Sequence, residues 1–272
     1  MDETRGEARH IVVSYDKELN ALHALIARMG VLAREELADS VTAICDRDTG
    51  LAATVMERDG ELDRLERAVE SQTLRLLALR QPMARDLREV VGALRISNNL
   101  ERIGDFAANV AKRAVALQSL AEVPVSASLR PIGQIAVGMV ADVMRAYDTD
   151  DLALATAVRD RDQDLDRAYT ALFRELLTYM MESPQRITAC THLLFAAKNL
   201  ERIGDHATNI AETICFRIKG RVPTEEREKG DTSPFELGDG GRASGAVGSA
   251  TTGTTGQAAG EASGAAAGSA TV

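Results

Sequence analysis

The heptapeptide NLERIGD occurs twice in this chain, at Asn99–Asp105 and at Asn199–Asp205, an offset of 100 residues. The likeness continues directly after it, where FAANVA in the first copy corresponds to HATNIA in the second. Upstream, RDGELDRLE from Arg58 corresponds to RDQDLDRAY from Arg161. Both copies carry the same segments in the same order, which indicates a tandem duplication.

Apolar residues around each copy of the motif recur at the spacing of an α-helix. Along residues 96–117 they follow one another in steps of four and three, and the same pattern runs along residues 193–214. This period is typical of a helix packed lengthwise in a bundle. Pro82 and Pro184 mark a turn within each copy. We therefore expect six helices, over residues 13–46, 50–80, 83–118, 129–148, 150–182 and 185–219.

The composition favours helices over sheets in the core. The chain of 272 residues is 45% hydrophobic but only 3% aromatic, whereas β-sandwich cores rely on aromatic and β-branched side chains. The predicted fold is all-α, a tandem duplication of two antiparallel three-helix bundles over residues 10–120 and 126–222. Residues 223–272, rich in Gly, Ala, Ser and Thr, are predicted to form a disordered C-terminal tail because they offer little apolar surface to bury.

The charge distribution and the cysteines narrow the range of partners and compartments. The net charge is −9 and no block of Lys and Arg is present, which argues against nucleic acid or an anionic membrane surface as partner. We find no secretory signal and no apolar run as long as a membrane span. The three cysteines are widely spaced, as expected for thiols in a reducing compartment. We therefore expect a cytoplasmic protein without membrane insertion.

Eight acidic residues form four pairs with a spacing of four residues, two pairs in each copy. Side chains at this spacing lie about 5–6 Å apart on one face of a helix, where like charges destabilise it. A single pair carries little information, but four pairs in register across a duplication indicate a site. The pairs are Asp59 with Asp63, Glu101 with Asp105, Asp162 with Asp166, and Glu201 with Asp205.

Counting outward from the turn predicts that the four acids of one copy meet. Asp63 and Glu101 each lie 19 residues from Pro82, on opposite sides, and Asp59 and Asp105 each lie 23 residues from it. In an antiparallel hairpin equal counts mean equal height, here about 28–35 Å from the turn. The second copy repeats the arrangement about its own proline to within a residue. Because the acids lie away from the apolar seam, we expect both quartets at the rim of the bundles.

A patch of four carboxylates is neutralised most directly by a multivalent cation. Ligands that are all oxygen suit Mg²⁺, Ca²⁺, Mn²⁺ or iron, whereas structural zinc normally takes Cys or His. The Glu-x-x-His motif of di-iron bundles is absent, because Gly104 and Gly204 occupy the third position after Glu101 and Glu201. Glycine is unfavourable in mid-helix, so these glycines indicate close helix packing or ligand access.

Three other interpretations stay open at this point. The acids could form a solvated face neutralised by nearby arginines, of which the candidates are Arg58, Arg102, Arg161 and Arg202. The chain could be a metal-free helical scaffold. It could also be a carboxylate-bridged di-metal enzyme, but the sequence offers no histidine ligand and no placed nucleophile, so we do not expect an enzyme.

The two motif copies resemble the PhoU family, the accessory regulators of bacterial phosphate-specific transport. The resemblance is carried by NLERIGDFAANV and NLERIGDHATNI, each preceded by an Asp-x-x-x-Asp segment and a turn. The turns are RQPMARDLR at Arg80–Arg88 and MMESPQRI at Met180–Ile187. The resemblance spans residues 10–220, and the Gly/Ala/Ser/Thr-rich tail lies outside the family pattern.

The resemblance implies a homodimer of six-helix protomers with multinuclear metal clusters on the eight acids already selected. Iron is the metal it favours, with Mg, Mn, Ca and Zn left open. It also implies a negative regulator of phosphate uptake and of phosphate-starvation signalling. Such a regulator would act as an adaptor between the ATPase subunit of the phosphate ABC transporter and the phosphate-sensing histidine kinase. The family has no established catalytic residue.

Overall fold

The computed structural model describes residues 3–124 and 128–221, with side chains from Tyr15 onward. Within these ranges the chain forms six α-helices and no strand, so the predicted all-α fold is confirmed. A short 3₁₀ turn, η2 (Pro184–Arg186), precedes the last helix. The helices are α1 (Glu3–Asp46), α2 (Thr49–Arg80), α3 (Arg85–Leu117), α4 (Leu129–Thr149), α5 (Leu152–Glu182) and α6 (Ile187–Lys219).

The predicted helix boundaries agree with the structure to within two residues, apart from the start of α1. That helix begins at Glu3, ten residues before the predicted start at residue 13. The additional segment contains Glu, Arg and Ala, which favour helix, but it lacks the apolar period on which the prediction relied. The predicted tail over residues 223–272 lies outside the described residues.

Equivalent side chains begin the second helix of each repeat. The Asp48 carboxylate accepts a hydrogen bond of 2.9 Å from the backbone N–H of Leu51, which caps α2. The Asp151 carboxylate accepts one of 3.0 Å from the N–H of Leu154 and caps α5. Aspartate suits this position because it satisfies an N–H that has no partner within the helix. The duplication therefore extends to the local signals that start the helices.

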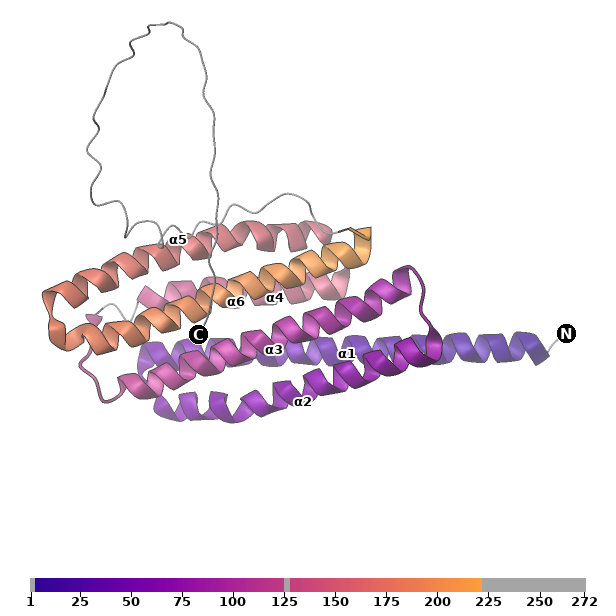
Figure 1. Ribbon diagram of the computed structural model, residues 1–272, viewed down its shortest axis with the longest axis horizontal. Coiled ribbons are helices and arrows are strands. Elements are labelled where there is room, and N and C mark those ends of the chain that lie inside the picture. Colours follow the sequence, from indigo (N-terminus) through magenta and orange to yellow (C-terminus); the bar gives the residue numbers. More distant parts are fainter. Residues whose placement is uncertain (1–2, 125–127, 222–272) are drawn as a thin grey trace, which may run out of the picture.

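The two three-helix bundles lie against each other along their length (Figure 1). Helix α3 packs along α6, and α1 packs along α4. The α2–α3 turn and the α5–α6 turn lie at opposite ends of the molecule, as Figure 1 shows. The motif-bearing helices α3 and α6 therefore meet in the centre of the molecule, where the two repeats touch.

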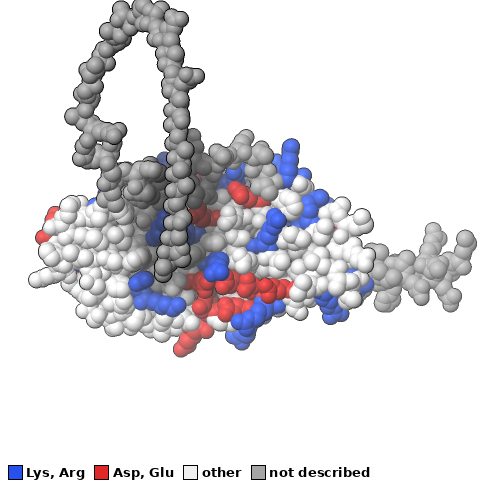
Figure 2. Space-filling view, viewed as in Figure 1, with Lys and Arg blue, Asp and Glu red and all other residues white. Residues whose placement is uncertain are grey.

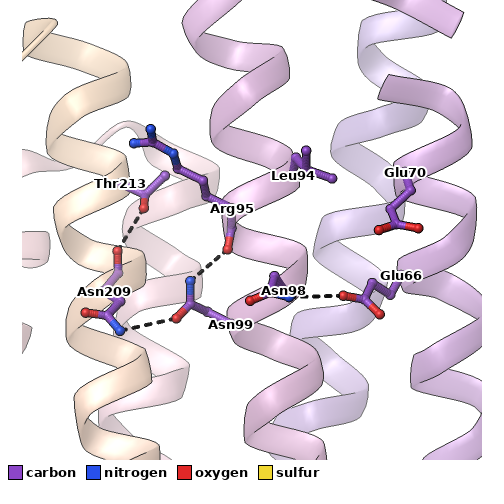
Figure 3. Close-up of a pocket in the computed structure, with 8 residues that line it drawn as sticks. All are labelled: Glu66, Glu70, Leu94, Arg95, Asn98, Asn99, Asn209 and Thr213. Carbon is purple, nitrogen blue, oxygen red and sulfur yellow. Dashed lines mark hydrogen bonds between the residues drawn. The ribbon is translucent and has the colours of Figure 1, made fainter. Parts of the chain in front are cut away.

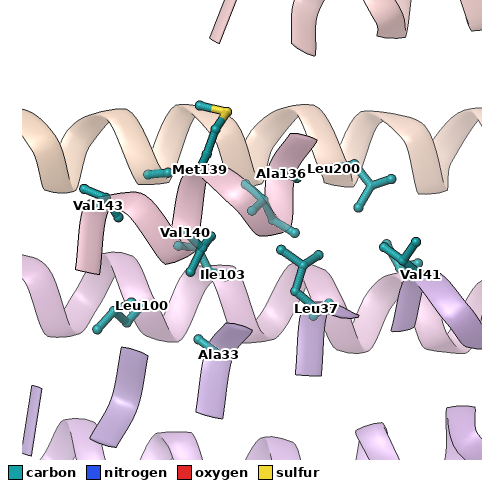
Figure 4. Packing of buried hydrophobic residues seen from close by; sticks show 14 of the residues in the cluster. Ala33, Leu37, Val41, Leu100, Ile103, Ala136, Met139, Val140, Val143 and Leu200 are labelled. Carbon is teal, nitrogen blue, oxygen red and sulfur yellow. The ribbon is translucent and has the colours of Figure 1, made fainter. Parts of the chain in front are cut away.

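A single buried apolar cluster runs through both repeats. Leu37 of α1, Ile103 of α3 and Val140 of α4 have no exposed surface and lie together in this cluster (Figure 4). Burying one Leu or Ile side chain contributes about 1.5–3 kcal/mol, so contacts between the repeats add to the stability that contacts within each repeat provide. Within the described residues, no helix carries an apolar stretch long enough to cross a membrane.

Candidate metal centres

The first centre consists of Asp59 and Asp63 on α2 and Glu101 and Asp105 on α3. Burial raises the pKa of Asp59, and the charges of Asp105 and Asp63 raise it further. Burial likewise raises the pKa of Glu101 to about 7, with Asp105 as the next contributor. Such mutual effects require proximity, so α2 and α3 bring Asp59 and Asp105 near each other, while a common meeting point for all four acids stays a prediction. Figure 2 shows acidic side chains gathered in a band across this face, with Lys and Arg at its margins.

The second centre consists of Asp162 and Asp166 on α5 and Glu201 and Asp205 on α6. Burial raises the pKa of Glu201, Lys198 opposes this increase, and the charges of Asp205 and Asp166 add to it. These effects require that Asp166 of α5 lies near Glu201 of α6, while the meeting of all four acids stays a prediction.

The predicted rim position is wrong for most of the second centre. Asp162, Asp166 and Glu201 are only 2%, 4% and 5% exposed. The prediction considered one apolar seam for each helix, whereas α6 packs against α3, α4 and α5. Its other faces are therefore covered as well. In the first centre, by contrast, all four acids are partly exposed.

Basic side chains form ion pairs with acids of both centres. Arg102 contacts Asp105 at 3.2 Å and Glu101 at 3.5 Å. Lys198 contacts Glu201 at 2.9 Å. On the other helix of the first centre, Arg67 contacts Asp63 at 3.7 Å, so basic residues of both α2 and α3 pair with its acids.

The remaining candidate arginines bind elsewhere. Arg58 and Arg161 form ion pairs with Asp39 at 2.8 Å and Asp142 at 2.6 Å, on the first helix of each repeat. Arg202 lies over the ring of Phe106 at 5.7 Å. The interpretation of a face neutralised by arginines therefore holds for Arg102 alone among the four candidates.

The mid-helix glycines allow the helices of each hairpin to approach closely. A Cβ atom at Gly104 would overlap the buried side chain of Leu62 on α2. A Cβ atom at Gly204 would overlap Leu165 on α5 in the same way, and it would lie 2.8 Å from Oδ1 of Asp162. Close packing, one of the two predicted reasons for these glycines, is thereby confirmed, and it holds the acidic pairs side by side.

Glu36 on α1 is a carboxylate that the sequence reasoning missed. Its side chain has no exposed surface, and neither of its oxygens has a hydrogen-bond partner. Burial raises its pKa to about 8, with Asp59 as the next contributor. The residue continues the apolar stripe of α1 through Met29, Ala33 and Ser40 in steps of four and three. A charged residue in a buried stripe was the signal that could have identified it.

Within each centre, the acidic side chains are neighbours, but they do not surround a common point. Within the described ranges, no three His, Cys, Asp or Glu side chains converge as a metal site requires. The donor set is nevertheless all oxygen, and buried oxygens of Glu36 and Glu201 lack any hydrogen-bond partner. An unpartnered buried carboxylate is costly, and a bound cation would remove that cost. The oxygen donors are of the chemical type that a hard cation prefers, but the described side chains do not converge on a common point.

Asn99, which begins the first NLERIGD motif, contacts residues that directly follow the second motif, where α3 meets α6. Nδ1 of His206 lies 2.9 Å from Oδ1 of Asn99, and this oxygen also accepts a weaker bond of 3.4 Å from Asn209. Because the amide oxygen only accepts, Nδ1 of His206 carries the hydrogen. The contact borders a groove of about 440 Å³ (Figure 3). The groove is lined by Glu66, Glu70, Leu94, Arg95, Asn98, Asn99, Asn209 and Thr213.

The family model described as "PhoU domain" matches the chain twice, over residues 26–114 and 129–214. The chain belongs to the PhoU family. Each match covers one three-helix repeat, so the duplication found in the sequence is a duplication of the PhoU domain. The first match includes Glu36 as well as the four acids of the first centre, and the second includes the four acids of the second centre.

Curated PhoU relatives match most of this chain. A "Phosphate-specific transport system accessory protein PhoU homolog" from Xylella fastidiosa is 50% identical, with 82% of this chain and 93% of the relative covered. One with the same name from Caulobacter vibrioides is 52% identical, with 82% of this chain and 97% of the relative covered.

Two solved PhoU structures have the same fold. The "Crystal structure of PhoU from Pseudomonas aeruginosa" superposes with a TM-score of 0.73 at 37% identity, covering 76% of this chain and all of that one. The "Crystal structure of the phosphate transport system regulatory protein PhoU from Streptococcus pneumoniae" gives a TM-score of 0.70 at 28% identity, covering 78% and 100%. The six-helix architecture is therefore that of PhoU.

Proposed function

We propose that this chain is an accessory protein of a phosphate transport system and acts as a negative regulator. Relatives that share half of its residues over most of its length carry the name of a phosphate-specific transport accessory protein. This similarity is the observation that carries the proposal. In phosphate-rich conditions the protein would restrain phosphate uptake and hold phosphate-starvation signalling off.

The protein would act as a cytoplasmic adaptor rather than as an enzyme. Its family and its helical fold point to a non-enzymatic accessory protein. Its partners would be the ATPase subunit of the phosphate ABC transporter and the phosphate-sensing histidine kinase, and it would act as a homodimer. A rigid bundle suits this task because it presents fixed surfaces to two partners.

The two acidic centres would bind hard cations, with iron as the first candidate. The ligands would be Asp59, Asp63, Glu101 and Asp105 in one centre, and Asp162, Asp166, Glu201 and Asp205 in the other. Bound cations would change each centre from a negative to a positive patch able to hold phosphate or an acidic partner surface. Because the described acidic side chains do not converge, binding would require them to turn toward the ion.

Metal content tests the centres directly. Elemental analysis of purified protein is expected to find bound metal, and the double variant Glu101→Ala with Asp105→Ala is expected to retain about half of it. The matched control is Glu35→Ala with Asp164→Ala, which removes two exposed acids outside the centres. Equal metal content in the double variant and the control would contradict the proposed centres.

Deletion of the gene in its native host tests the regulatory role. Phosphate uptake and phosphatase expression are expected to stay high in phosphate-rich medium, and the wild-type gene is expected to restore repression. A chain that lacks both centres, tested beside the exposed-acid control, then separates the metal proposal from the regulatory one. Unchanged expression after deletion would contradict the regulatory role.

A further inference from the structure

The hairpin turns of the two repeats carry different charges. Residues 74–88 form the α2–α3 tip, which contains four arginines and one aspartate. Residues 176–190, the equivalent α5–α6 tip, contain one arginine and one glutamate. The first tip therefore has a net charge of +3 and the second has none, although the whole chain has a net charge of −9. The two tips lie at opposite ends of the molecule (Figure 1), so a partner can contact one without the other.

The α2–α3 tip also exposes a group of large apolar side chains. Ten such side chains are exposed in the part of the chain that the structure describes, and four of them belong to this tip, Leu74, Leu79, Met83 and Leu87. Leu74 lies eight residues before Pro82 and Leu87 lies five residues after it, so all four lie within about 12 Å of the turn along the helices. Single exposed apolar side chains are common, whereas a group of them marks an interaction surface.

The backbone of this turn adopts an unfavourable conformation. Gln81 and Ala84 have positive φ angles of 45° and 49°, which residues with a Cβ atom rarely adopt. Met83 lies between them and is 80% exposed. Among the described residues, none of the α5–α6 turn has a positive φ angle. Such conformations concentrate at functional segments, so the cost of presenting Met83 to solvent agrees with a binding role for this turn.

Two arginines of the α2–α3 tip have acidic neighbours. Arg80 forms an ion pair of 2.8 Å with Glu18 of α1, which neutralises it. Arg85 makes only longer contacts, of 3.7 Å to Asp150 and 4.0 Å to Glu89, and its side chain is 72% exposed. Arg85 is therefore available to a partner, whereas Arg80 is not.

The other two arginines keep their charge. Arg75 is exposed and forms no ion pair with any described residue. Nε of Arg88 donates a hydrogen bond of 3.3 Å to the backbone carbonyl of Arg217, which is a neutral acceptor. Positive charge and exposed apolar side chains therefore lie together at this tip. A surface of this kind is complementary to an acidic segment that also carries apolar side chains.

We propose that the α2–α3 tip is the docking surface for an acidic, partly apolar segment on the ATPase subunit of the phosphate transporter. This inference rests on the proposed function, which names that subunit as a partner. Burial of the four apolar side chains would hold the segment, and Arg75 and Arg85 would bind its carboxylates. Two copies of this chain that met tip to tip would bring like charges together, so a second copy is a poorer occupant.

Biolayer interferometry of the full-length chain with the purified ATPase subunit from the same host tests the apolar part of this surface. Leu79→Ser with Met83→Ser is expected to raise the dissociation constant at least tenfold, because it removes two exposed apolar side chains of the tip. The matched control is Met181→Ser with Ile187→Ser at the α5–α6 tip, where Met181 is 79% exposed. The control is expected to bind like the wild type.

The charged part of the surface is tested with the same assay. Binding by the wild type is expected to weaken as the salt concentration rises, because salt screens exposed charges. Arg75→Gln with Arg85→Gln is expected to raise the dissociation constant at least fivefold and to reduce the salt dependence. Arg34→Gln removes an exposed arginine sixteen residues along α1 from Glu18 and is expected to change neither. All substituted side chains are exposed, and circular dichroism confirms that each variant is folded.

The outcomes separate this inference from the proposed function. Wild-type affinity in both tip variants, or an equal loss in the α5–α6 control, would overturn the inference and leave the proposed partner standing. Absence of binding between the wild type and the ATPase subunit would overturn the inference and that partner, while the gene deletion still tests the regulatory role. Two further measurements cover other occupants, namely sedimentation velocity for self-association and flotation with phosphatidylglycerol vesicles. Self-association or vesicle binding that the tip variants abolish, with binding to the ATPase subunit unchanged, would also overturn the inference.

Discussion

Replacing Gly104 by alanine tests whether close helix approach holds the first centre together. The new Cβ atom would overlap Leu62, which is buried between α2 and α3, and would lie 3.2 Å from Oε2 of Glu36. Leu62 cannot move into solvent, so it must push into neighbouring core atoms. Gly60 provides a matched control, because it lies on the exposed face of α2 and a Cβ atom there would meet nothing within 4 Å.

The expected energies follow from two opposing effects. Alanine is about 1 kcal/mol better than glycine inside a helix, and both variants gain this amount. Forcing an additional carbon into a filled core typically costs about 1–3 kcal/mol, and only Gly104→Ala carries that cost. Gly60→Ala should therefore be more stable than the wild type by about 1 kcal/mol. The difference between the two variants isolates the cost of overlap, about 1–3 kcal/mol.

Urea unfolding of the EDTA-treated protein, followed by circular dichroism, measures this difference. Gly204→Ala repeats the test in the second centre, where the overlapped side chain is Leu165. If Gly104→Ala proves as stable as Gly60→Ala, α2 and α3 leave enough space for a methyl group at position 104. Gly104 would then not set the distance between the acidic pairs of α2 and α3.

Three further perturbations test separate parts of the structure. Burial raises the pKa of Glu36 above its unfolded value to about 8. The metal-free protein should therefore lose stability as the pH rises from about 4.5 through about 8, and melting temperatures of Glu36→Gln should depend less on pH than those of Glu35→Gln. Asp151→Ala removes the cap of α5 and should lower the free energy of unfolding in urea by about 1 kcal/mol. Asp151→Asn should retain most of the wild-type stability, because an Asn side chain also caps a helix. Asn99→Ala leaves the N–H of His206 without its acceptor and should cost about 1–3 kcal/mol, more than Asn98→Ala on the exposed face. Equal stabilities for the two asparagine variants would show that the contact between Asn99 and His206 contributes little.

Several features of the fold follow from local sequence patterns. The duplication, the six helices and the turn at each proline all depend on residues that lie close together along the chain. Counting residues from Pro82 placed Asp59 near Asp105 because an antiparallel hairpin has a constant rise per residue. The same counting could not place α1 beside this hairpin, so it missed Glu36.

The sequence by itself determined which acids are paired and which helices carry them, because helical period and turn position are local properties. Only the tertiary structure decided how deeply the acids of each centre are buried. Burial depends on every helix packed around a residue, and α3, α4 and α5 all cover α6. The same packing brought Glu36 beside Gly104 and Met139 beside Gly204. Two repeats with nearly identical motifs therefore surround their acids with different chemistry.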